Sequence, residues 1–536
     1  MSHKSRSSKK SSHKKHEESS SDDCDTQRRS GCDSGCRADG CPTPSISTAM
    51  CQRDCDPLLK VVDSRAIGSA ATYTALSPDG TQAISLLSTF LGSVVTVPID
   101  FQLFNNNCGV LTPTETRLPE NATNYATTPS LISNAAVAFN FRIAAGIYEY
   151  VDNPTDANSL GTGFVDVFDP SNPTVNLFSF PLVNNVSETF LPFTTNTKYL
   201  TGISSDNRYL TLSYQTAIDQ GVVQVYDLRT GELVAEGFTN GFSNGPSFFD
   251  LCQSKNCDRD DCGRKNKHRS QCVRRRFVAI GSNGLNAGVN LAPAIFQIFE
   301  LRENSLFEVA RESTSSQLRS ISVPTGLCCP PETLIAISTT GVIPGQPTLY
   351  TNSPAARNSL NGQIGGVTIF RFNGERLREV ARQPVELGFV NAVGFTPNGK
   401  YLAIAFGTSA SGFAFPSFFQ LFRVVNQDDC SVCLYPLDIP RPSGQQILTL
   451  PFSLNGKWLI VSGGIVNSTP PNPNFPLGLI KNFQVYQLVY PECCPDQCGE
   501  LECIKQNACN TKKACKTSEC NRDYQISRCN RDNRYY

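Results

Sequence analysis

Short apolar runs separated by turn-forming residues dominate the sequence between residues 57 and 490. In these runs Val, Ile, Phe, Thr and Tyr alternate with polar residues, and Gly, Pro, Asn and Asp interrupt them. Alternation with a period of two is the pattern of a β-strand, whereas an amphipathic helix repeats its apolar positions every three or four residues. The sequence has no long stretch with the helical period. The pattern therefore predicts an all-β fold.

One four-residue strand pattern recurs seven times along this region. It consists of an aromatic residue or Val, then Gln, Asp or Thr, then an aliphatic residue, then Phe or Tyr, and its copies start between 52 and 73 residues apart. Because successive side chains of a strand point to opposite faces, both faces of each copy are mostly apolar, which is typical of a strand covered on both sides. The copies are Phe101–Phe104, Val165–Phe168, Val223–Tyr226, Phe296–Phe299, Val367–Phe370, Phe419–Phe422 and Phe483–Tyr486.

A tight-turn signal precedes four of these strands. The Asp or Asn of the turn lies 17 to 28 residues before the repeated strand, and an apolar strand follows each turn. Asp-Gly and Asn-Gly favour hairpin turns because Gly and Asn adopt positive φ at low steric cost. Seven units of about four strands predict a seven-bladed β-propeller, closed by pairing of Leu58–Asp63 with the last blade. The turns are Ser77–Gly80, Ser204–Asn207, Thr396–Gly399 and Ser453–Gly456.

Two of these elements resemble known propeller repeats. Val223–Val234 resembles the third strand and turn of a WD-repeat blade, with Tyr226-Asp227 in the place of Trp-Asp, and the four turns resemble those of YVTN-type propellers. The resemblance spans residues 60–490 and implies blade architecture without a specific function. It departs from WD repeats in lacking the Gly-His dipeptide and in having blades longer than the usual ~40–45 residues.

Composition divides the chain into three parts. Residues 1–56 and 491–536 are polar and rich in cysteine, and we expect both tails to be disordered unless they are cross-linked. Residues 57–490 form the predicted propeller. Its excess length is expected in loops, where binding usually resides. The expected insertions are 107–130, 151–162, 251–276, 341–365 and 467–481.

Cysteine is the most unusual component, with 23 copies of which 14 lie in the tails. Dense cysteine in small polar segments is typical of a disulfide framework, and an odd total leaves at least one thiol outside intramolecular pairs. Because the N-terminus shows no secretory signal, oxidation during maturation of an assembled particle is the expected route. The candidate cross-linking residues are Cys24, Cys32, Cys36, Cys41, Cys51, Cys55, Cys252, Cys257, Cys262, Cys272, Cys430, Cys433, Cys493, Cys494, Cys498, Cys503, Cys509, Cys515, Cys520 and Cys529.

Other readings of the cysteines stay open. In the insertion 251–276, the four cysteines and His268 have the ligand types of a zinc site, but their spacing lacks the common Cys-x2-Cys pair. Reduced thiols in loops and in cytosolic tails are the remaining alternative. The adjacent Cys328 and Cys329 are strained as a mutual disulfide, so each pairs elsewhere or stays reduced.

The same insertion is basic, with nine Lys or Arg against three Asp. Such a patch favours an anionic partner, and the alternative is a solvated loop. The chain as a whole carries 47 basic and 47 acidic residues, which argues against a general nucleic-acid binder. The candidate residues for an anionic partner are Arg264, Lys265, Lys267, Arg269, Arg274, Arg275 and Arg276.

Histidine is nearly missing, since the four copies lie at His3, His13, His16 and His268. Outside the charged insertion 251–276, the propeller region therefore lacks a Ser-His-Asp triad and a His-ligated metal centre. We predict no catalytic residue, cofactor or metal site, and Asp79, Asp206 and Asp227 are interpreted as turn residues. The longest apolar run is shorter than the ~18 residues that would span a bilayer.

These features favour a non-catalytic interaction protein over an enzyme. We expect a propeller that binds protein partners, with cysteine-rich tails that cross-link it to neighbours or to copies of itself in a particle or surface layer. The combination of a Ser/Lys-rich start, a loop-heavy propeller and cysteine tails resembles virion proteins of large DNA viruses, which implies a virion location. The alternatives are a lactonase-like propeller hydrolase with a carboxylate-bound metal and a cytoplasmic WD-like scaffold.

Overall fold

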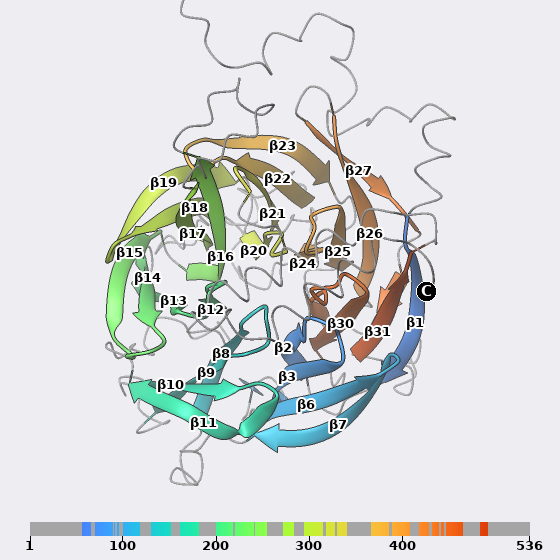
Figure 1. The fold of residues 1–536 in the computed structure, drawn as a ribbon, viewed down its shortest axis with the longest axis horizontal. Helices are drawn as coiled ribbons and strands as arrows, with labels where there is room; N and C mark the ends of the chain where they lie inside the picture. The colour runs from blue at the N-terminus through green and yellow to red at the C-terminus, as the bar shows by residue number, and fades with distance from the viewer. Residues whose placement is uncertain are drawn as a thin grey trace, which may run out of the picture.

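Seven β-sheets follow one another around a ring in the computed structural model of the chain (Figure 1). The part of the chain that the structure describes contains strands and turns but no helix that could cross a membrane. The structure describes residues 56–65, 70–88, 90–91, 94–95, 100–117, 130–151, 161–181, 200–217, 220–240, 242–254, 272–283, 294–314, 318–326, 330–339, 366–384, 389–407, 417–427, 431–438, 441–443, 446–464 and 483–490.

Each sheet has four strands in antiparallel order, one sheet has an additional fifth strand, and we number these blades 1 to 7 along the chain. Blade 1 consists of β2 (Ala70–Leu76), β3 (Gln82–Ser88), β6 (Asp100–Asn107) and β7 (Val110–Arg117). Blade 2 consists of β8 (Ser130–Val137), β9 (Ala144–Val151), β10 (Gly161–Asp169) and β11 (Asn172–Pro181). Blade 3 consists of β12 (Leu200–Ile203), β13 (Tyr209–Ala217), β14 (Gln220–Asp227) and β15 (Leu233–Thr239). Blade 4 consists of β16 (Phe242–Ser254), β17 (Cys272–Asn283), β18 (Ala294–Arg302) and β19 (Ser305–Thr314).

The remaining blades follow the same order. Blade 5 consists of β20 (Leu318–Ser322), β21 (Thr333–Thr339), β22 (Gly366–Phe372) and β23 (Leu377–Pro384). Blade 6 consists of β24 (Phe389–Phe395), β25 (Tyr401–Gly407), β26 (Ser417–Asn426) and β27 (Val432–Pro436), with β28 (Arg441–Ser443) added beside β26. Blade 7 consists of β29 (Gln446–Thr449), β30 (Trp458–Gly464), β31 (Phe483–Val489) and β1 (Leu58–Arg65). A two-residue pair, β4 (Phe90–Leu91) and β5 (Val94–Val95), lies between β3 and β6 in the sequence.

The repeated strand pattern occupies the third strand of every blade, which confirms the predicted seven-bladed propeller. Its aromatic positions pack from one blade to the next because the faces of adjacent sheets meet there. Phe101 of blade 1 meets Phe168 of blade 2 with ring centroids 5.0 Å apart, and Phe419 of blade 6 meets Tyr486 of blade 7 at 4.8 Å. The apolar first, third and fourth positions of the pattern therefore build the core between blades.

The side chain at the second position of the pattern forms a hydrogen bond to the outer, fourth strand of the same blade. The Gln224 amide donates to Glu236 at 2.8 Å, and the Gln297 amide donates to Glu308 at 2.7 Å. A long amide side chain satisfies a polar group where the sheet faces are otherwise apolar. This hydrogen bond explains why Gln recurs at the second position of the pattern, where the alternation alone does not specify a residue type.

The N-terminal strand closes the ring, as predicted. β1 pairs antiparallel with β31, and Leu58 lies opposite Val489. Just before this strand, the Asp56 carboxylate pairs with Arg423 of blade 6 at 2.9 Å. Near its other end, the Asp63 carboxylate accepts a hydrogen bond from the Leu111 backbone of blade 1 at 3.2 Å. The first strand thus ties the last blade to both of its neighbours, and one sheet edge is removed.

Two expected insertions are partly strand. Residues 110–117 form β7, and the arms of the 251–276 insertion, residues 251–254 and 272–276, belong to β16 and β17. The expectation that loops fill both stretches was wrong there, because the hairpin ladder continues past the point where the apolar pattern ends. Residues 1–55 and 491–536 lie outside the described residues, so the disorder of the tails stays a prediction.

Candidate interaction site at the joint of blades 3 and 4

The four predicted tight turns join the first and second strands of their blades and share one set of hydrogen bonds. In blade 3, the Ser204 hydroxyl bonds to the Asp206 carboxylate at 2.6 Å and accepts the Tyr209 backbone N–H at 2.9 Å. The Asn207 N–H donates to the Ser204 carbonyl at 2.9 Å. The turns of blades 1, 6 and 7 repeat these contacts, with Gly in the place of Asn207. The positive φ of this position, 59° at Asn207, explains the preference for Gly or Asn.

Blade 2 contains a fifth turn of the same kind that the sequence pattern missed. The Phe141 N–H donates to the Ala138 carbonyl at 2.7 Å, and Phe141 has a φ of 57°. Ala138 replaces the capping hydroxyl and Phe141 replaces Gly, so the turn carries neither of its usual sequence markers. The signal that remains is Asn140, whose side chain accepts the Arg142 N–H at 3.2 Å.

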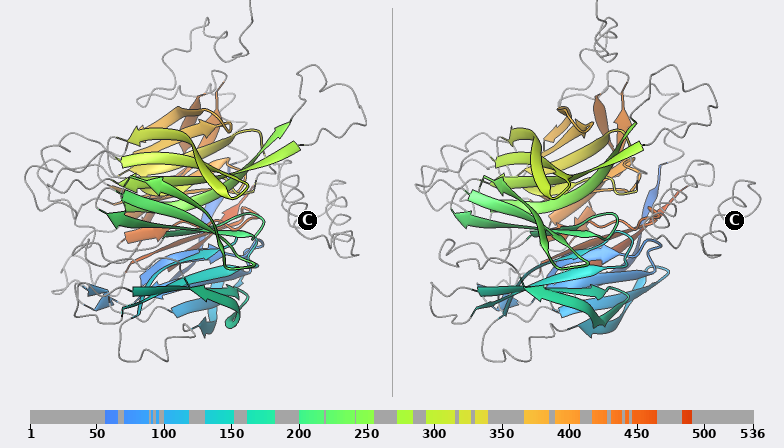
Figure 2. Two further views of the ribbon diagram at one scale, coloured as in Figure 1. Left: turned by 90° about the vertical axis from the view of Figure 1, so that its left-hand side faces the viewer. Right: turned by 60° about the vertical axis from the view of Figure 1, so that its left-hand side comes forward.

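The tight-turn contacts of blades 1, 2, 3, 6 and 7 have no counterpart among the described residues of blade 4. Instead β16 and β17 stay paired as far as Ser254 and Cys272, and this hairpin projects beyond the neighbouring turns in Figure 2. Its arms carry Asp250 on β16 and three consecutive arginines, Arg274 to Arg276, on β17. The polar end of this hairpin therefore lies where other blades have a compact turn.

Strand alternation sends the three arginines to two different neighbours. Arg274 and Arg276 face blade 3, where Arg276 pairs with Asp206 at 2.8 Å. Arg275 faces blade 5, where a Cβ on Gly374 would lie 3.0 Å from its guanidinium. The same alternation places Phe277 beside Phe372 of blade 5, with ring centroids 5.1 Å apart. The arginine run therefore connects blade 4 to the blades on both sides.

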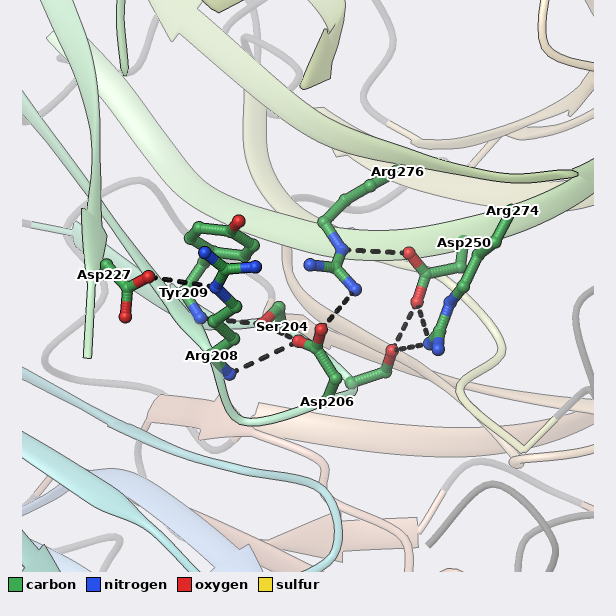
Figure 3. Close-up of polar contacts among 9 residues, drawn as sticks. Ser204, Asp206, Arg208, Tyr209, Asp227, Asp250, Arg274 and Arg276 are labelled. Atoms are coloured by element: carbon green, nitrogen blue, oxygen red, sulfur yellow. Dashed lines mark hydrogen bonds and ion pairs between the residues drawn. The ribbon is translucent and has the colours of Figure 1, made fainter. Parts of the chain in front are cut away.

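An ionic network forms where blade 4 meets the turn of blade 3 (Figure 3). Arg276 lies between two carboxylates, with Asp206 at 2.8 Å and Asp250 at 3.1 Å. Asp250 also pairs with Arg274 and accepts a hydrogen bond from Ser205. The Arg276 and Asp250 side chains are only 13% and 7% exposed. Because a buried charge is destabilising without an opposite charge beside it, each of these groups depends on the other.

Tyr209 lies between two guanidinium groups in the same network. The Arg208 and Arg276 guanidinium carbons lie 4.8 Å and 5.1 Å from its ring centroid. Arg208 in turn donates to the Asp227 carboxylate at 2.9 Å. Stacked guanidinium groups of this kind gain from the negative face of the ring, and Asp227 fixes the outer one. Asp227 is thus both the turn residue that the sequence predicted and an ion-pair partner that it missed.

The pKa shifts in the network result from burial opposed by close partners of opposite charge. Burial acts to raise the pKa of Asp206, but the charge of Arg276 and the hydrogen bonds from Ser204, Arg276 and the Arg208 N–H outweigh it, so that the pKa is lowered. For Arg276, burial acts to lower the pKa, and Asp250 and Asp206 raise it overall. Both groups are therefore charged at neutral pH.

A second ion pair completes the other side of the hairpin. Arg275 donates two hydrogen bonds to Glu300, at 2.6 and 2.7 Å, and Glu300 also pairs with Arg302. Glu300 lies on the third strand of blade 4 and is only 4% exposed. Burial acts to raise the pKa of Glu300, but the hydrogen bonds from Arg275 and Arg302 and their charges lower it. The hydrogen bonds from Arg275 and Arg302 to the Glu300 carboxylate therefore fix Arg275 against its own blade.

The structure brings together three of the seven residues proposed for an anionic partner. Arg274, Arg275 and Arg276 are each paired with a carboxylate of the chain itself. Within the network of Figure 3, three arginines meet three aspartates, so its formal charge is zero. The other four, Arg264, Lys265, Lys267 and Arg269, lie outside the described residues, and their role stays a prediction.

Three of the candidate cross-linking cysteines can be located on strands. Cys252 of β16 is disulfide-bonded, and Cys272 begins β17. Cys433 of β27 is fully buried and forms no disulfide in this structure, and its proposed disulfide or cross-link stays a prediction. Cys108, which we did not propose, is an exposed reduced thiol in the β6–β7 turn. The remaining candidates lie outside the described residues.

Among the described residues, no group of three or more His, Cys, Asp or Glu is placed to hold a metal ion. What the joint provides is a rigid base of buried ion pairs beneath a projecting hairpin. Such a base can position a binding element, and its own charged atoms are engaged with each other.

Three solved structures are similar to this chain at low levels of identity. One is a chain in the crystal structure of a mitotic checkpoint complex, with 10% identity over 82% of this chain and 92% of that chain and a TM-score of 0.42. A second is the Dos1 propeller, with 10% identity over 80% and 95% and a TM-score of 0.41. A third is the hydrazine synthase of Kuenenia stuttgartiensis, with 14% identity over 75% and 95% and a TM-score of 0.42.

No family model matches the sequence, and no curated protein is significantly similar to it. At 10–14% identity, the three structural similarities say nothing about partners or activity, and they do not concern virion proteins.

Proposed function

We propose that this protein is a non-catalytic scaffold that binds protein partners and is cross-linked through its cysteine-rich tails into an assembled particle, with a virion as the favoured case. The observation that carries the proposal is the pairing of β1 with β31. This pairing places Leu58 opposite Val489, so the described chain ends at Asp56 and Tyr490 beside one outer strand. All 14 tail cysteines are therefore tethered to one edge of the ring.

Tethering at one edge raises the effective concentration of thiols there. Two rings that meet edge to edge would bring two sets of cysteines within reach of each other, so that later bonds form as intramolecular steps. Two rings that meet through another edge would hold the points at which the tails leave the ring farther apart. The arrangement supports cross-linking in a defined orientation rather than random aggregation.

The test is electrophoresis of native material in which thiols are blocked before lysis. We expect a ladder of multimers without reductant and a monomer with reductant. A full-length variant with the 14 tail cysteines changed to Ser should run as a monomer in both conditions, while the control Cys108→Ser should keep the ladder. A wild-type monomer in which every tail thiol is alkylated would overturn the proposal.

A further inference from the structure

The outer strand of blade 7 presents a free edge. β1 is the last strand in the order of its sheet, and among the described residues it pairs with β31 alone (Figure 1). One row of its backbone groups therefore faces away from the ring. Two of its apolar side chains are exposed, Leu58 by 71% and Val61 by 47%. Such an edge is a template for pairing with a further strand.

Several other outer strands contain residues that oppose such pairing. Pro113 interrupts β7 and Pro173 lies near the start of β11, and a proline has no N–H to donate to a neighbouring strand. β23 presents the exposed ion pair of Glu379 and Arg382. β1 contains no proline, and four of its eight residues are Leu or Val. Its edge is therefore open to a partner strand of matching chemistry.

The register of β1 decides which of its side chains share a face. Seven of its residues pair with β31, with Val61 in the middle of the seven and a bulge between Val61 and Asp63. Lys60 lies opposite Gln487. Asp63 lies opposite Val485, two positions away on β31. Because alternate residues of a strand point to the same face, the bulge places Lys60 and Asp63 on one face of the sheet.

β1 is therefore complementary to a second copy of itself in antiparallel orientation. A twofold axis at Val61 sets the two Val61 residues against each other and Lys60 opposite Asp63 of the second copy. Lys60 is exposed and has no ion-pair partner among the described residues. The Oδ2 atom of Asp63 accepts hydrogen bonds from Arg65 and Leu111, whereas its Oδ1 atom has no such partner within the described part of the chain. Opposite charges at facing positions stabilise paired strands.

We propose that two copies of the chain associate through antiparallel pairing of their β1 strands. The pairing joins two blade 7 sheets into one continuous sheet across a twofold axis, which is an isologous interface. The inference rests on the proposed function, because it names the contact that brings the tails of two copies together. The described chain ends at Asp56 and Tyr490 beside this strand, so four tails would leave the dimer at one place.

Sedimentation velocity of the full-length protein in reductant tests the contact, because no disulfide then holds two copies together. We expect a monomer–dimer equilibrium over a concentration series. Val61→Lys sets two lysines against each other at the axis and should raise the dissociation constant of the dimer roughly tenfold or more. Leu177→Lys is the matched control on the outer strand of blade 2, where Leu177 is 53% exposed, and it should leave the dimer unchanged. A wild-type monomer throughout the series, or a dimer that Val61→Lys does not weaken, would rule out the contact.

A mixing experiment separates lost pairing from lost folding. Val61→Lys and Val61→Glu should each be monomeric alone, and an equimolar mixture should recover the dimer, because the axis then sets Lys against Glu. A mixture that stays monomeric contradicts a twofold axis at Val61. The test of the tail cross-links gives a separate answer. A dimer in reductant without a ladder in its absence supports this inference and overturns the cross-linking, and a ladder with only monomer in reductant does the reverse.

Discussion

Two joints of the ring are held by opposite chemistry. Where blade 7 meets blade 1, the turn of one blade touches the turn of the other through neutral groups. Asn455 donates its backbone N–H to the Pro78 carbonyl at 2.9 Å and its side-chain amide to the Asp79 carbonyl at 2.8 Å. Where blade 4 meets blade 3, Arg274 and Arg276 reach the opposing turn as cations, and Arg276 is largely buried.

The difference follows from the missing turn of blade 4. The blade 7 turn can donate from its own backbone because it is compact, and Trp458 behind it packs against Gly80 of blade 1. Blade 4 extends into a hairpin instead, so its strand arms must meet the blade 3 turn with side chains. Long arginine side chains span that distance, and Asp250 is needed to balance them. At the joint of blades 3 and 4, ion pairs thus take the place of the turn-to-turn contact that joins blades 7 and 1.

The largest expected effect comes from removing the shared carboxylate of the ionic joint. Asp250→Ala leaves Arg276, only 13% exposed, with Asp206 alone, and it leaves Arg274 without its carboxylate. Breaking a buried pair from one side costs about 3–5 kcal/mol. We expect a loss of that size in the free energy of unfolding, measured by denaturant titration.

The surface pair Arg382–Glu379 is the matched control, since both side chains are largely exposed. Glu379→Ala should change the free energy of unfolding by no more than about 0.5 kcal/mol. Equal losses for the two variants would show that the joint of blades 3 and 4 is no more than a surface salt bridge, and the contrast with the neutral joint would disappear.

The joint between blades 7 and 1 is neutral, so we expect added side-chain volume, rather than a change of charge, to destabilise it. A Cβ on Gly80 would lie 2.1 Å from Cδ1 of Trp458, and Gly80 has a φ of 76°. Gly80→Ala should therefore cost about 2–4 kcal/mol in the free energy of unfolding, from overpacking and backbone strain together. Gly456→Ala has a similar φ of 67° but open space, since the nearest atom is 3.7 Å away.

Gly456→Ala thus measures the cost of the positive φ alone, and we expect it to lower the free energy of unfolding by about 1 kcal/mol. The measurement is the same denaturant titration. If both variants lose the same amount, the contact between Trp458 and blade 1 contributes nothing to the joint.

Acid weakens the ionic joint with a smaller effect. The pKa of Asp206 is lowered in the folded protein, because Arg276 and three hydrogen bonds outweigh burial. Its contribution to stability is therefore complete above the unfolded pKa of about 3.9 and is lost as the pH falls through the lower folded value. The turns of blades 6 and 7 carry Asn398 and Asn455 at the same position, and these side chains do not titrate. The blade 1 turn carries Asp79, where hydrogen bonds from Thr81 and Ser77 outweigh burial and also lower the pKa.

Asp206→Asn should keep the turn but remove the ion pair. We expect it to lower the free energy of unfolding by about 1–2 kcal/mol at pH 7, and we expect its difference from wild type to shrink as the pH falls below the unfolded pKa of about 3.9. Unfolding midpoints measured from pH 7 to pH 2.5 test this. A constant difference over that range would mean that Asp206 acts through the turn alone.

The two joints also differ in how far the sequence could predict them. The turn of blade 7 is local, so the four residues Ser453–Gly456 are enough to predict it. The third strand of that blade is likewise predicted from the alternation within Phe483–Tyr486 alone. The ionic joint pairs Asp206 with Arg276, 70 residues away, and no local pattern links them. Composition grouped Arg274 to Arg276 with the basic insertion, whereas strand alternation separates them.

A usable signal for the joint was present in the sequence. The apolar run Phe277–Ile280 directly follows the three arginines and identifies them as part of a strand. Alternation along that strand would have divided the arginines between two faces. Their partners would still have been unknown, because the order of blades around the ring decides which turn lies opposite. That information is tertiary and depends on β1 closing the ring.

The smallest expected effect tests whether the ionic joint also costs the blade 3 turn some stability. Asn207 occupies the left-handed position that is Gly in blades 1, 6 and 7, and its side-chain oxygen is buried without a hydrogen-bond partner. Asn207→Gly removes both penalties, and we expect it to raise the free energy of unfolding by about 0.5–1 kcal/mol. The reverse change, Gly399→Asn in blade 6, should lower it by a similar amount through the same backbone term. If Asn207→Gly is instead destabilising, the Asn side chain holds the turn beneath Arg276, and the ionic joint extends one residue further than its ion pairs indicate.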